Sequence, residues 1–186
     1  MKKVLVYAES EKSAVRMADA LRGHGGFDVF YSADVGALCR DCDAYDALIV
    51  MMPSSVPETL EALKKISLCS CAGVVLVTKS ETVREAEVAL QGLGVAVVSL
   101  PINVTLFSNS LHTAVIMSER LRAVRRENER LRCTIDDLKL VDRAKCALIQ
   151  YLNMTEADAH RFIEKQAMNK RVSKRDVALE ILKTYE

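Results

Sequence analysis

The chain has 186 residues, of which 50% are hydrophobic, and its 26 basic and 25 acidic side chains give a formal net charge of +1. So much apolar surface can offset the conformational entropy of the chain, which excludes a mainly disordered protein and suits one ordinary domain with a smaller appendage. No apolar run reaches the roughly 18 residues of a membrane helix, so we expect a soluble, cytoplasmic protein without membrane association.

The first 110 residues alternate between short β-branched runs and amphipathic segments. The runs predict strands at Lys3–Tyr7, Asp28–Tyr31, Ala47–Met51, Val74–Thr78 and Ala96–Leu100. The segments between them predict helices at Glu11–Gly23, Val35–Cys42, Pro57–Ser67 and Glu81–Gly92. The third and fourth runs are apolar without alternation, as strands buried on both faces require. We therefore expect an α/β fold of the flavodoxin-like kind, with a doubly wound five-stranded parallel sheet, over residues 1–110.

In such a sheet the functional side chains lie at the carboxyl ends of the strands. These ends carry Ala8 and Glu9, then Met51 and Met52, then Thr78, and finally Leu100. The layout resembles the receiver domain of two-component response regulators. The resemblance implies an acidic pair where Ala8 and Glu9 stand, a phospho-accepting Asp at Met51 or Met52, and a Lys at Leu100.

The substituted residues remove the chemistry of a receiver. A thioether at Met51 or Met52 is no nucleophile for a phosphoryl group, and Glu9 alone is a poor ligand set for Mg²⁺. Without a Lys at position 100, no cation holds the phosphoryl oxygens. We therefore predict a pseudo-receiver without a phosphoacceptor. Asp46 precedes the third strand, at the wrong end of the sheet for this role.

Six cysteines occur at positions 39, 42, 69, 71, 133 and 146, and we expect no structural disulfides among them in a cytoplasmic protein. Cys39-x-x-Cys42 together with Cys69-x-Cys71 loosely resembles the spacing of metal ligands. The alternative, which we prefer, is that these residues are small hydrophobes in accidental pairs. We accordingly predict neither a metal nor a cofactor.

From Asn103 to Tyr151 the chain has no Pro and no Gly, which predicts one long helix with a regular apolar seam. In a heptad register that starts at Ala114, the a and d positions are occupied by Met117, Leu121, Val124, Asn128, Leu131, Ile135 and Leu138. A lone Asn at an a position fixes the register of parallel two-stranded coiled coils. We predict a parallel homodimeric coiled coil over residues 111–139. The alternative is a helix that packs onto its own domain.

Beyond this seam, residues 140–186 predict a three-helix unit. The heptad fails at Asp142 and Lys145, and a new apolar stripe contains Leu140, Ala144, Ala147, Leu148 and Tyr151. Thr155 and Ser173 each precede an acid by three residues, as in a capping box, and so begin two further helices. The inward positions of these helices are Ala159, Phe162, Ile163 and Ala167, and then Val177, Ala178, Ile181 and Leu182.

Four ordered motifs follow one another in this unit. They are Ala144-Lys145, Asn153-Met154-Thr155-Glu156-x-x-Ala159, Phe162-x-x-x-Gln166-Ala167-Met168 and Val172-Ser173-x-x-Asp176-Val177-Ala178. Over residues 140–182 they resemble the ANTAR domain, whose members are RNA-binding transcription antitermination regulators. Two positions depart from the usual pattern: Cys146 stands where Gly is common, and His160 replaces an aromatic residue.

The resemblance implies a homodimer that binds two adjacent hairpins in a nascent leader mRNA. Stabilisation of these hairpins prevents the terminator from forming, so that the polymerase reads on. Because the pseudo-receiver lacks a phosphoacceptor, the resemblance also suggests control by a protein partner, such as a ligand-sensing protein that sequesters the dimer.

Residues 112–186 carry 16 basic and 12 acidic side chains, which suits an anionic partner. Candidate RNA contacts around the turn between the last two helices are Lys165, Lys170, Arg171, Lys174 and Arg175. Arg143, Lys145 and Arg161 join them if the bundle folds as expected. The small Ala144 and Ala167 would let a base approach the backbone, although core packing explains them equally well.

Two other function classes remain open. The last two helices fit a DNA-binding response regulator loosely, and a dimeric adaptor without nucleic-acid activity is a third hypothesis. The sequence contains no nucleophile–base pair, no Gly-rich phosphate loop and no His cluster, so we do not expect an enzyme.

Overall fold

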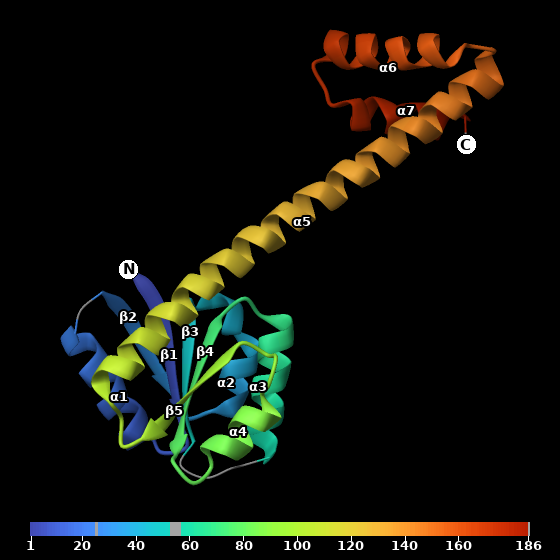
Figure 1. Ribbon diagram of the computed structural model, residues 1–186. Coiled ribbons are helices and arrows are strands. Elements are labelled where there is room, and N and C mark those ends of the chain that lie inside the picture. Colours follow the sequence, from blue (N-terminus) through green and yellow to red (C-terminus); the bar gives the residue numbers. More distant parts are fainter. Residues whose placement is uncertain (25, 53–56, 186) are drawn as a thin grey trace. The chain divides into compact units, whose positions relative to one another are not determined.

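The computed structural model describes residues 1–24, 26–52 and 57–185. It divides into two compact units, Met1–Ala123 and Val124–Glu186, which we describe one at a time (Figure 1). The helix α5 (Val104–Leu152) begins in the first unit and ends in the second. None of the helices in the described ranges combines the length and the hydropathy needed to cross a membrane.

A five-stranded parallel sheet forms the centre of the first unit, with the strand order β2-β1-β3-β4-β5. Its strands are β1 (Lys2–Ala8), β2 (Phe27–Ser32), β3 (Ala47–Met52), β4 (Gly73–Lys79) and β5 (Val95–Leu100). Nearly every residue of β3 and β4 is buried, as their unbroken apolar runs predict. The sheet confirms the predicted flavodoxin-like α/β fold.

Helices cover both faces of the sheet. One face carries α1 (Glu11–His24) and the first turns of α5, and the other carries α2 (Val35–Arg40), α3 (Pro57–Cys69) and α4 (Val83–Ala89) (Figure 1). Each face has its own hydrophobic core. The first unit is therefore a three-layer sandwich with the sheet in the middle.

Two of its helices are shorter than the sequence predicts. The helix expected over Val35–Cys42 ends at Arg40 and is followed by a 3₁₀ turn, η1 (Cys42–Ala44). The helix expected over Glu81–Gly92 spans only Val83–Ala89. The glycines that follow it adopt φ angles of +79° and +69°, which no right-handed helix contains, so the chain turns there toward β5.

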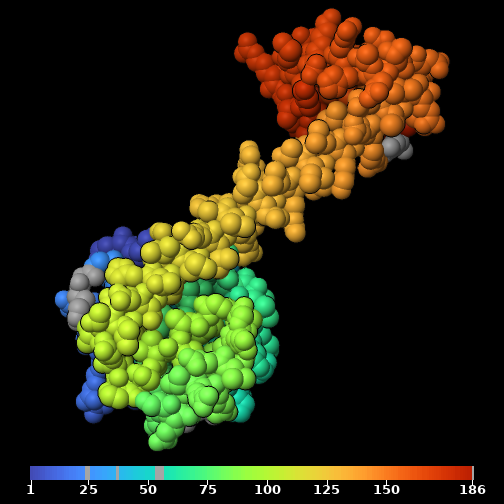
Figure 2. All heavy atoms as spheres, viewed as in Figure 1, coloured from blue at the N-terminus to red at the C-terminus, as the bar shows by residue number. Residues whose placement is uncertain are grey.

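The beginning of α5 belongs to the core of the first unit. Phe107, Leu111, Ala114 and Val115 are all buried in the core that α5 shares with α1 and the sheet, and the space-filling view shows these turns against the rest of the unit (Figure 2). A Cβ on Gly73 would lie 2.1 Å from the carbonyl oxygen of Ala114. The alternative of a helix packed on its own domain is therefore correct for this face, and Ala114 does not extend the exposed seam.

Asp46 ties α5 to the amino-terminal end of the sheet. Its carboxylate accepts a hydrogen bond from the Lys3 backbone N–H at 2.8 Å and pairs with the Arg122 guanidinium at 2.6 Å. Arg122 also donates to the carbonyl oxygen of Tyr45 at 2.5 Å. Asp46 thus lies at the end of β3 opposite to the carboxyl edge, as predicted, and has a structural partner there.

The second unit is a three-helix bundle. The end of α5 packs with α6 (Glu156–Lys170) and α7 (Lys174–Tyr185). Its core contains Val141, Ala144, Ala147, Leu148, Ala159, Ile163, Ala167, Val177, Ala178, Ile181 and Leu182. The predicted inward faces of α6 and α7 are thereby confirmed, with Phe162 only partly buried. The three-part division at residues 110 and 139 stays a prediction.

Side-chain caps begin both short helices. The Thr155 hydroxyl accepts a hydrogen bond from the Asp158 backbone N–H at 3.2 Å. The Ser173 hydroxyl accepts one from the Asp176 N–H at 3.1 Å, while the Asp176 carboxylate accepts from the Ser173 N–H at 3.2 Å. Ser173 and Asp176 form the reciprocal pair of a capping box. Between these helices Arg171 adopts a left-handed conformation, with φ of 55°, and ends α6.

Candidate functional site

The carboxyl edge of the sheet brings together the residues that the receiver resemblance singles out. Ala8 is opposite Met51 in the register of β1 and β3, and Met52 is opposite Thr78 in that of β3 and β4. Met51 is partly buried against the core on the α1 and α5 face, whereas Met52 is buried in the core on the opposite face. The Thr78 hydroxyl shares a hydrogen bond of 2.6 Å with the Thr82 hydroxyl.

The four cysteines with metal-like spacing do not assemble a metal centre within the described residues. Cys39 and Cys69 are exposed and Cys71 is buried. In the described ranges, no group of three or more His, Cys, Asp or Glu side chains has a geometry that would hold an ion. The backbone N–H of Cys71 instead donates to the Asp43 carboxylate at 3.0 Å, which gives this region a structural role.

In the second unit, several of the predicted RNA contacts are held in ion pairs. The Lys145 Nζ forms ion pairs with the Asp142 Oδ1 at 2.8 Å and the Glu156 Oε1 at 3.3 Å. The hydrogen bonds to these carboxylates raise the pKa of Lys145. Lys174 pairs with Glu164 at 2.6 Å, and this hydrogen bond lowers the pKa of the Glu164 carboxyl.

Two more of the predicted contacts are paired. Lys170 forms an ion pair with Glu180. Arg175 forms one with Asp137, and the hydrogen bond between these two side chains raises the pKa of Arg175. All of these pairs except Lys145–Asp142, which lies within α5, join residues of different helices. The basic turn between α6 and α7 therefore has partly neutralised charges.

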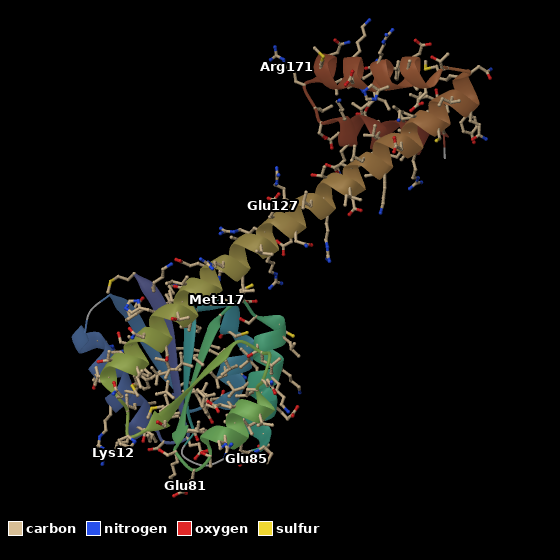
Figure 3. The ribbon with its side chains drawn as sticks, viewed as in Figure 1. Lys12, Glu81, Glu85, Met117, Glu127 and Arg171 are labelled. Carbon is tan, nitrogen blue, oxygen red and sulfur yellow. The ribbon has the colours of Figure 1, made fainter. Side chains whose placement is uncertain are left out.

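Three other predicted contacts are exposed and lie outside these pairs. Arg161 and Lys165 are four residues apart on α6, so they project from one face of the helix, and Arg171 follows at the end of α6 (Figure 3). Within residues 57–185, none of the described ion pairs includes Arg161, Lys165 or Arg171. We call these three residues, two on one side of α6 and one at its C-cap, the basic face of α6. Arg143 is also exposed, on α5.

Ala144 and Ala167 lie in the core of the bundle rather than on its surface. Ala144 is fully buried and Ala167 is 9% exposed. Packing against the other two helices accounts for their small side chains, so the surface that we consider for RNA omits them.

A stacked pair of tyrosines, one exposed and one partly buried, is a feature that the sequence pattern does not predict. Tyr151, predicted to lie on the inward stripe of α5, is 54% exposed, and its ring stacks on that of Tyr185 with centroids 5.5 Å apart. The two residues are close only because α5 and α7 end at the same end of the bundle.

The predicted seam of α5 is exposed in the single chain. The exposed fractions of its apolar side chains lie between 46% and 66%, for Met117 (labelled in Figure 3), Leu121, Val124, Leu131, Ile135 and Leu138. Asn128 is exposed as well. Half-exposed apolar side chains at regular spacing on one helix are what an unoccupied helix-packing face looks like.

Comparison with known proteins defines the class of both units. Residues 129–182 match the family model of the ANTAR domain, which confirms the resemblance seen in the sequence. The first unit has the fold of receiver domains: a response regulator receiver domain protein from Clostridium thermocellum matches it with a TM-score of 0.56 at 16% identity, covering 65% of this chain and 99% of that one. The chain thus combines a receiver-like fold with an ANTAR domain.

Two relatives match over nearly the full length. The transcriptional regulatory protein PdtaR of Mycobacterium tuberculosis, in strains CDC 1551 and H37Rv, is 24% identical over 185 residues, which are 98% of this chain and 90% of PdtaR. The response regulator StyR matches with a TM-score of 0.59 at 10% identity, covering 100% of both chains. The PdtaR match relates the chain to a transcriptional regulatory protein, and the match to StyR shows a shared fold.

Proposed function

We propose that this protein is a transcription antitermination regulator whose ANTAR domain binds hairpins in nascent leader mRNA as a homodimer. The observation that carries the proposal is the basic face of α6, which lies inside the segment that matches the ANTAR domain. PdtaR, which matches nearly the whole chain, is itself a transcriptional regulatory protein.

The chemistry of the basic face suits a folded RNA. Specific RNA recognition targets unpaired loop bases, while Lys and Arg hold the adjacent phosphates. Arg161 and Lys165 are four residues apart, a rise of about 6 Å along α6, so both side chains face the same stretch of a bound strand. Because these residues have no described carboxylate partner, they bind phosphate without first breaking an ion pair, unlike Lys145 or Lys174.

The exposed seam of α5 supports the dimer. A single helix that leaves six apolar side chains half exposed gains free energy by packing against a second copy. Asn128 within the seam favours a parallel pair in one register. Two parallel chains present two ANTAR domains, so two adjacent hairpins add avidity to a modest affinity for each one.

Control of this dimer proceeds without aspartyl phosphorylation. At the carboxyl edge, Met51 and Met52 offer thioethers where an acyl phosphate needs a carboxylate, and Ala8 offers no oxygen to a cation. A sensor protein that binds the first unit or covers the seam provides the alternative signal.

The test is a binding measurement with an RNA of two adjacent hairpins. In the variant Arg161→Gln/Lys165→Gln/Arg171→Gln we expect an affinity loss of about tenfold or more. The slope of log affinity against log salt falls by about one for each phosphate contact that is removed. The matched control, Lys12→Gln/Lys79→Gln/Arg84→Gln, removes the same charge from exposed positions of the first unit and leaves the affinity unchanged.

Three outcomes contradict the proposal. Equal loss in both triple variants would make the effect one of net charge and remove the basic face of α6 from the site. Tighter binding to duplex DNA than to hairpin RNA would favour a DNA-binding regulator. No binding to either nucleic acid, by a protein that is dimeric in solution, would favour the adaptor.

A further inference from the structure

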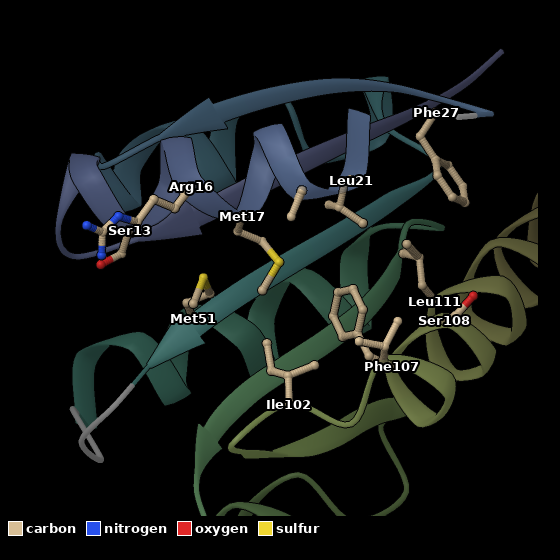
Figure 4. Close-up of a pocket in the computed structure, with 12 residues that line it drawn as sticks. Ser13, Arg16, Met17, Leu21, Phe27, Met51, Ile102, Phe107, Ser108 and Leu111 are labelled. Atoms are coloured by element: carbon tan, nitrogen blue, oxygen red, sulfur yellow. The ribbon is translucent and has the colours of Figure 1, made fainter. Parts of the chain in front are cut away.

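The first unit contains a cavity of about 480 Å³ between α1, the end of β3 and the first turns of α5 (Figure 4). Apolar side chains make up most of its wall: Met17, Leu21, Phe27, Met51, Ile102 and Phe107. Cavities that hold small organic ligands in proteins measure about 300–1,000 Å³ and are lined in this way. All the lining residues belong to the first unit, so the cavity is complete within one chain.

The cavity has one charged lining residue, Arg16, and the Ser108 hydroxyl lies away from it on α5 (Figure 4). Ser13 and Arg16 of α1 lie together at one end, near Met51, while Leu21 and Phe27 line the other end (Figure 4). The Arg16 side chain is exposed, and among the described residues no hydrogen bond or ion pair engages it. The cavity is therefore amphipathic, with one positive charge at its rim and an apolar interior.

We propose that this cavity binds a small organic carboxylate with an apolar body. The guanidinium of Arg16 presents parallel N–H donors that match the two oxygens of a carboxylate. The Ser13 hydroxyl, one helical turn before Arg16, adds a donor at the same end. The apolar body of the ligand then extends past Met17 toward Leu21 and Phe27, where its burial supplies the main part of the affinity.

Met51 supplies apolar cavity wall at one of the two positions where a receiver domain would have its phospho-accepting carboxylate. The receiver resemblance places a charged carboxylate at Met51 or Met52, and a negative charge at the position of Met51 would repel a carboxylate bound to Arg16. The thioether instead contributes apolar, adaptable surface to the cavity wall. A site that has lost the phosphoryl chemistry has in this way gained a surface suited to an organic anion.

Ligand binding also acts on α5. Phe107, Ser108 and Leu111 line the cavity from the first two turns of this helix. A ligand that contacts them binds only while these turns are packed against the sheet, so it stabilises that packing by mass action. The cavity thus couples a small molecule to the beginning of the helix that continues into the ANTAR domain.

The experiment is a calorimetric titration of the full chain with octanoate as the probe. We expect saturable binding of one octanoate per chain, weaker binding of the neutral octanamide, and none of acetate, which lacks the apolar body. Arg16→Gln should weaken octanoate by about tenfold while leaving octanamide unchanged. The matched control is Lys65→Gln, which removes a charge from an exposed position of α3, on the other face of the sheet and outside the cavity wall, and should leave both affinities unchanged.

A second variant keeps the test independent of charge. Ser108→Phe places a ring at the cavity wall from an exposed position of α5 and should abolish binding of octanoate and of octanamide. Thermal unfolding and circular dichroism confirm that the variant is folded. The proposal is overturned if the wild-type chain does not bind octanoate, or if Arg16→Gln and Lys65→Gln weaken octanoate binding equally. It is also overturned if Ser108→Phe leaves octanoate binding intact. If this variant also changes the mass of the protein in solution, the cavity is instead an interface between copies of the chain.

Discussion

Gly73 shows how a single missing side chain sets the position of a helix. At this residue, the first of β4, the backbone of α5 approaches so closely that any Cβ would meet the Ala114 carbonyl carbon and oxygen at 2.4 and 2.1 Å. Neither partner can yield easily, because one belongs to the central sheet and the other to the core of the first unit. The position of α5 against the sheet therefore depends on a hydrogen atom in place of a methyl group.

Gly73→Ala is accordingly expected to destabilise the first unit by about 1–3 kcal/mol, the usual cost of overpacking a core. The measurement is the urea midpoint of the full chain. Gly23→Ala serves as the control, because its Cβ would meet nothing within 4 Å, and Ala favours the helix that contains it. Equal midpoints for Gly73→Ala and the wild type would mean that α5 is free to shift away from the sheet.

At the scale of elements, the beginning of α7 is held by two ionised carboxylates, Asp176 in its cap and Glu164 on α6. Hydrogen bonds from the hydroxyl and N–H of Ser173 lower the pKa of Asp176 below its ordinary value of 3.8. The hydrogen bond from Lys174 lowers the pKa of Glu164 below 4.5. A carboxyl whose pKa is lower in the folded state contributes stability above its unfolded pKa and loses it as the pH falls through the folded value.

We therefore expect the melting temperature of the second unit to fall as the pH decreases from about 4.5 toward 3, with little change between pH 5 and 7. The measurement is helical circular dichroism against temperature at a series of pH values. In Ser173→Ala the hydroxyl, the main cause of the lowered Asp176 pKa, is absent while the backbone N–H remains. The variant should therefore be less stable at pH 6 and should lose less stability on acidification. A melting temperature that rises below pH 4.5 would contradict this sign.

The elements themselves were largely predictable, and their contacts were not. The strands follow from unbroken β-branched runs, and α6 and α7 follow from their capping residues and helical apolar spacing. Ala144 remained ambiguous because a small side chain suits both a core and an approaching base. The pairing of Arg175 with Asp137, 38 residues apart, depends on how α7 lies against α5, which periodicity does not contain.

The cavity could not be predicted from the sequence for a similar reason. Its wall combines α1, the end of β3 and the segment from Ile102 into α5, so its residues come together only once the sheet order is known. The sequence shows that Met51 is a thioether at the carboxyl end of a strand. Its contribution to an apolar wall required the position of its neighbours on α1 and α5.

At the scale of the whole molecule, the seam lies in the part of α5 between two packed regions of the chain. Val115 is buried in the first unit and Val141 in the second, and the apolar residues from Met117 to Leu138 lie between them in the sequence. Neither core uses these side chains. The proposed dimer therefore assigns a partner to the apolar residues that the folding of one chain leaves exposed.

Leu131→Asp places a charge at a d position of this seam and should convert the dimer to a monomer, because two buried carboxylates would face each other across the interface. Cys133→Asp is the matched control, since it adds the same charge at an exposed f position and should leave the dimer intact. Light scattering gives the mass of each variant. With avidity lost, Leu131→Asp should bind the two-hairpin RNA at least about 100-fold more weakly, yet bind a single hairpin as tightly as before. A dimeric Leu131→Asp variant would place the dimer contact elsewhere, and a monomer with unchanged two-hairpin affinity would separate RNA binding from dimerisation.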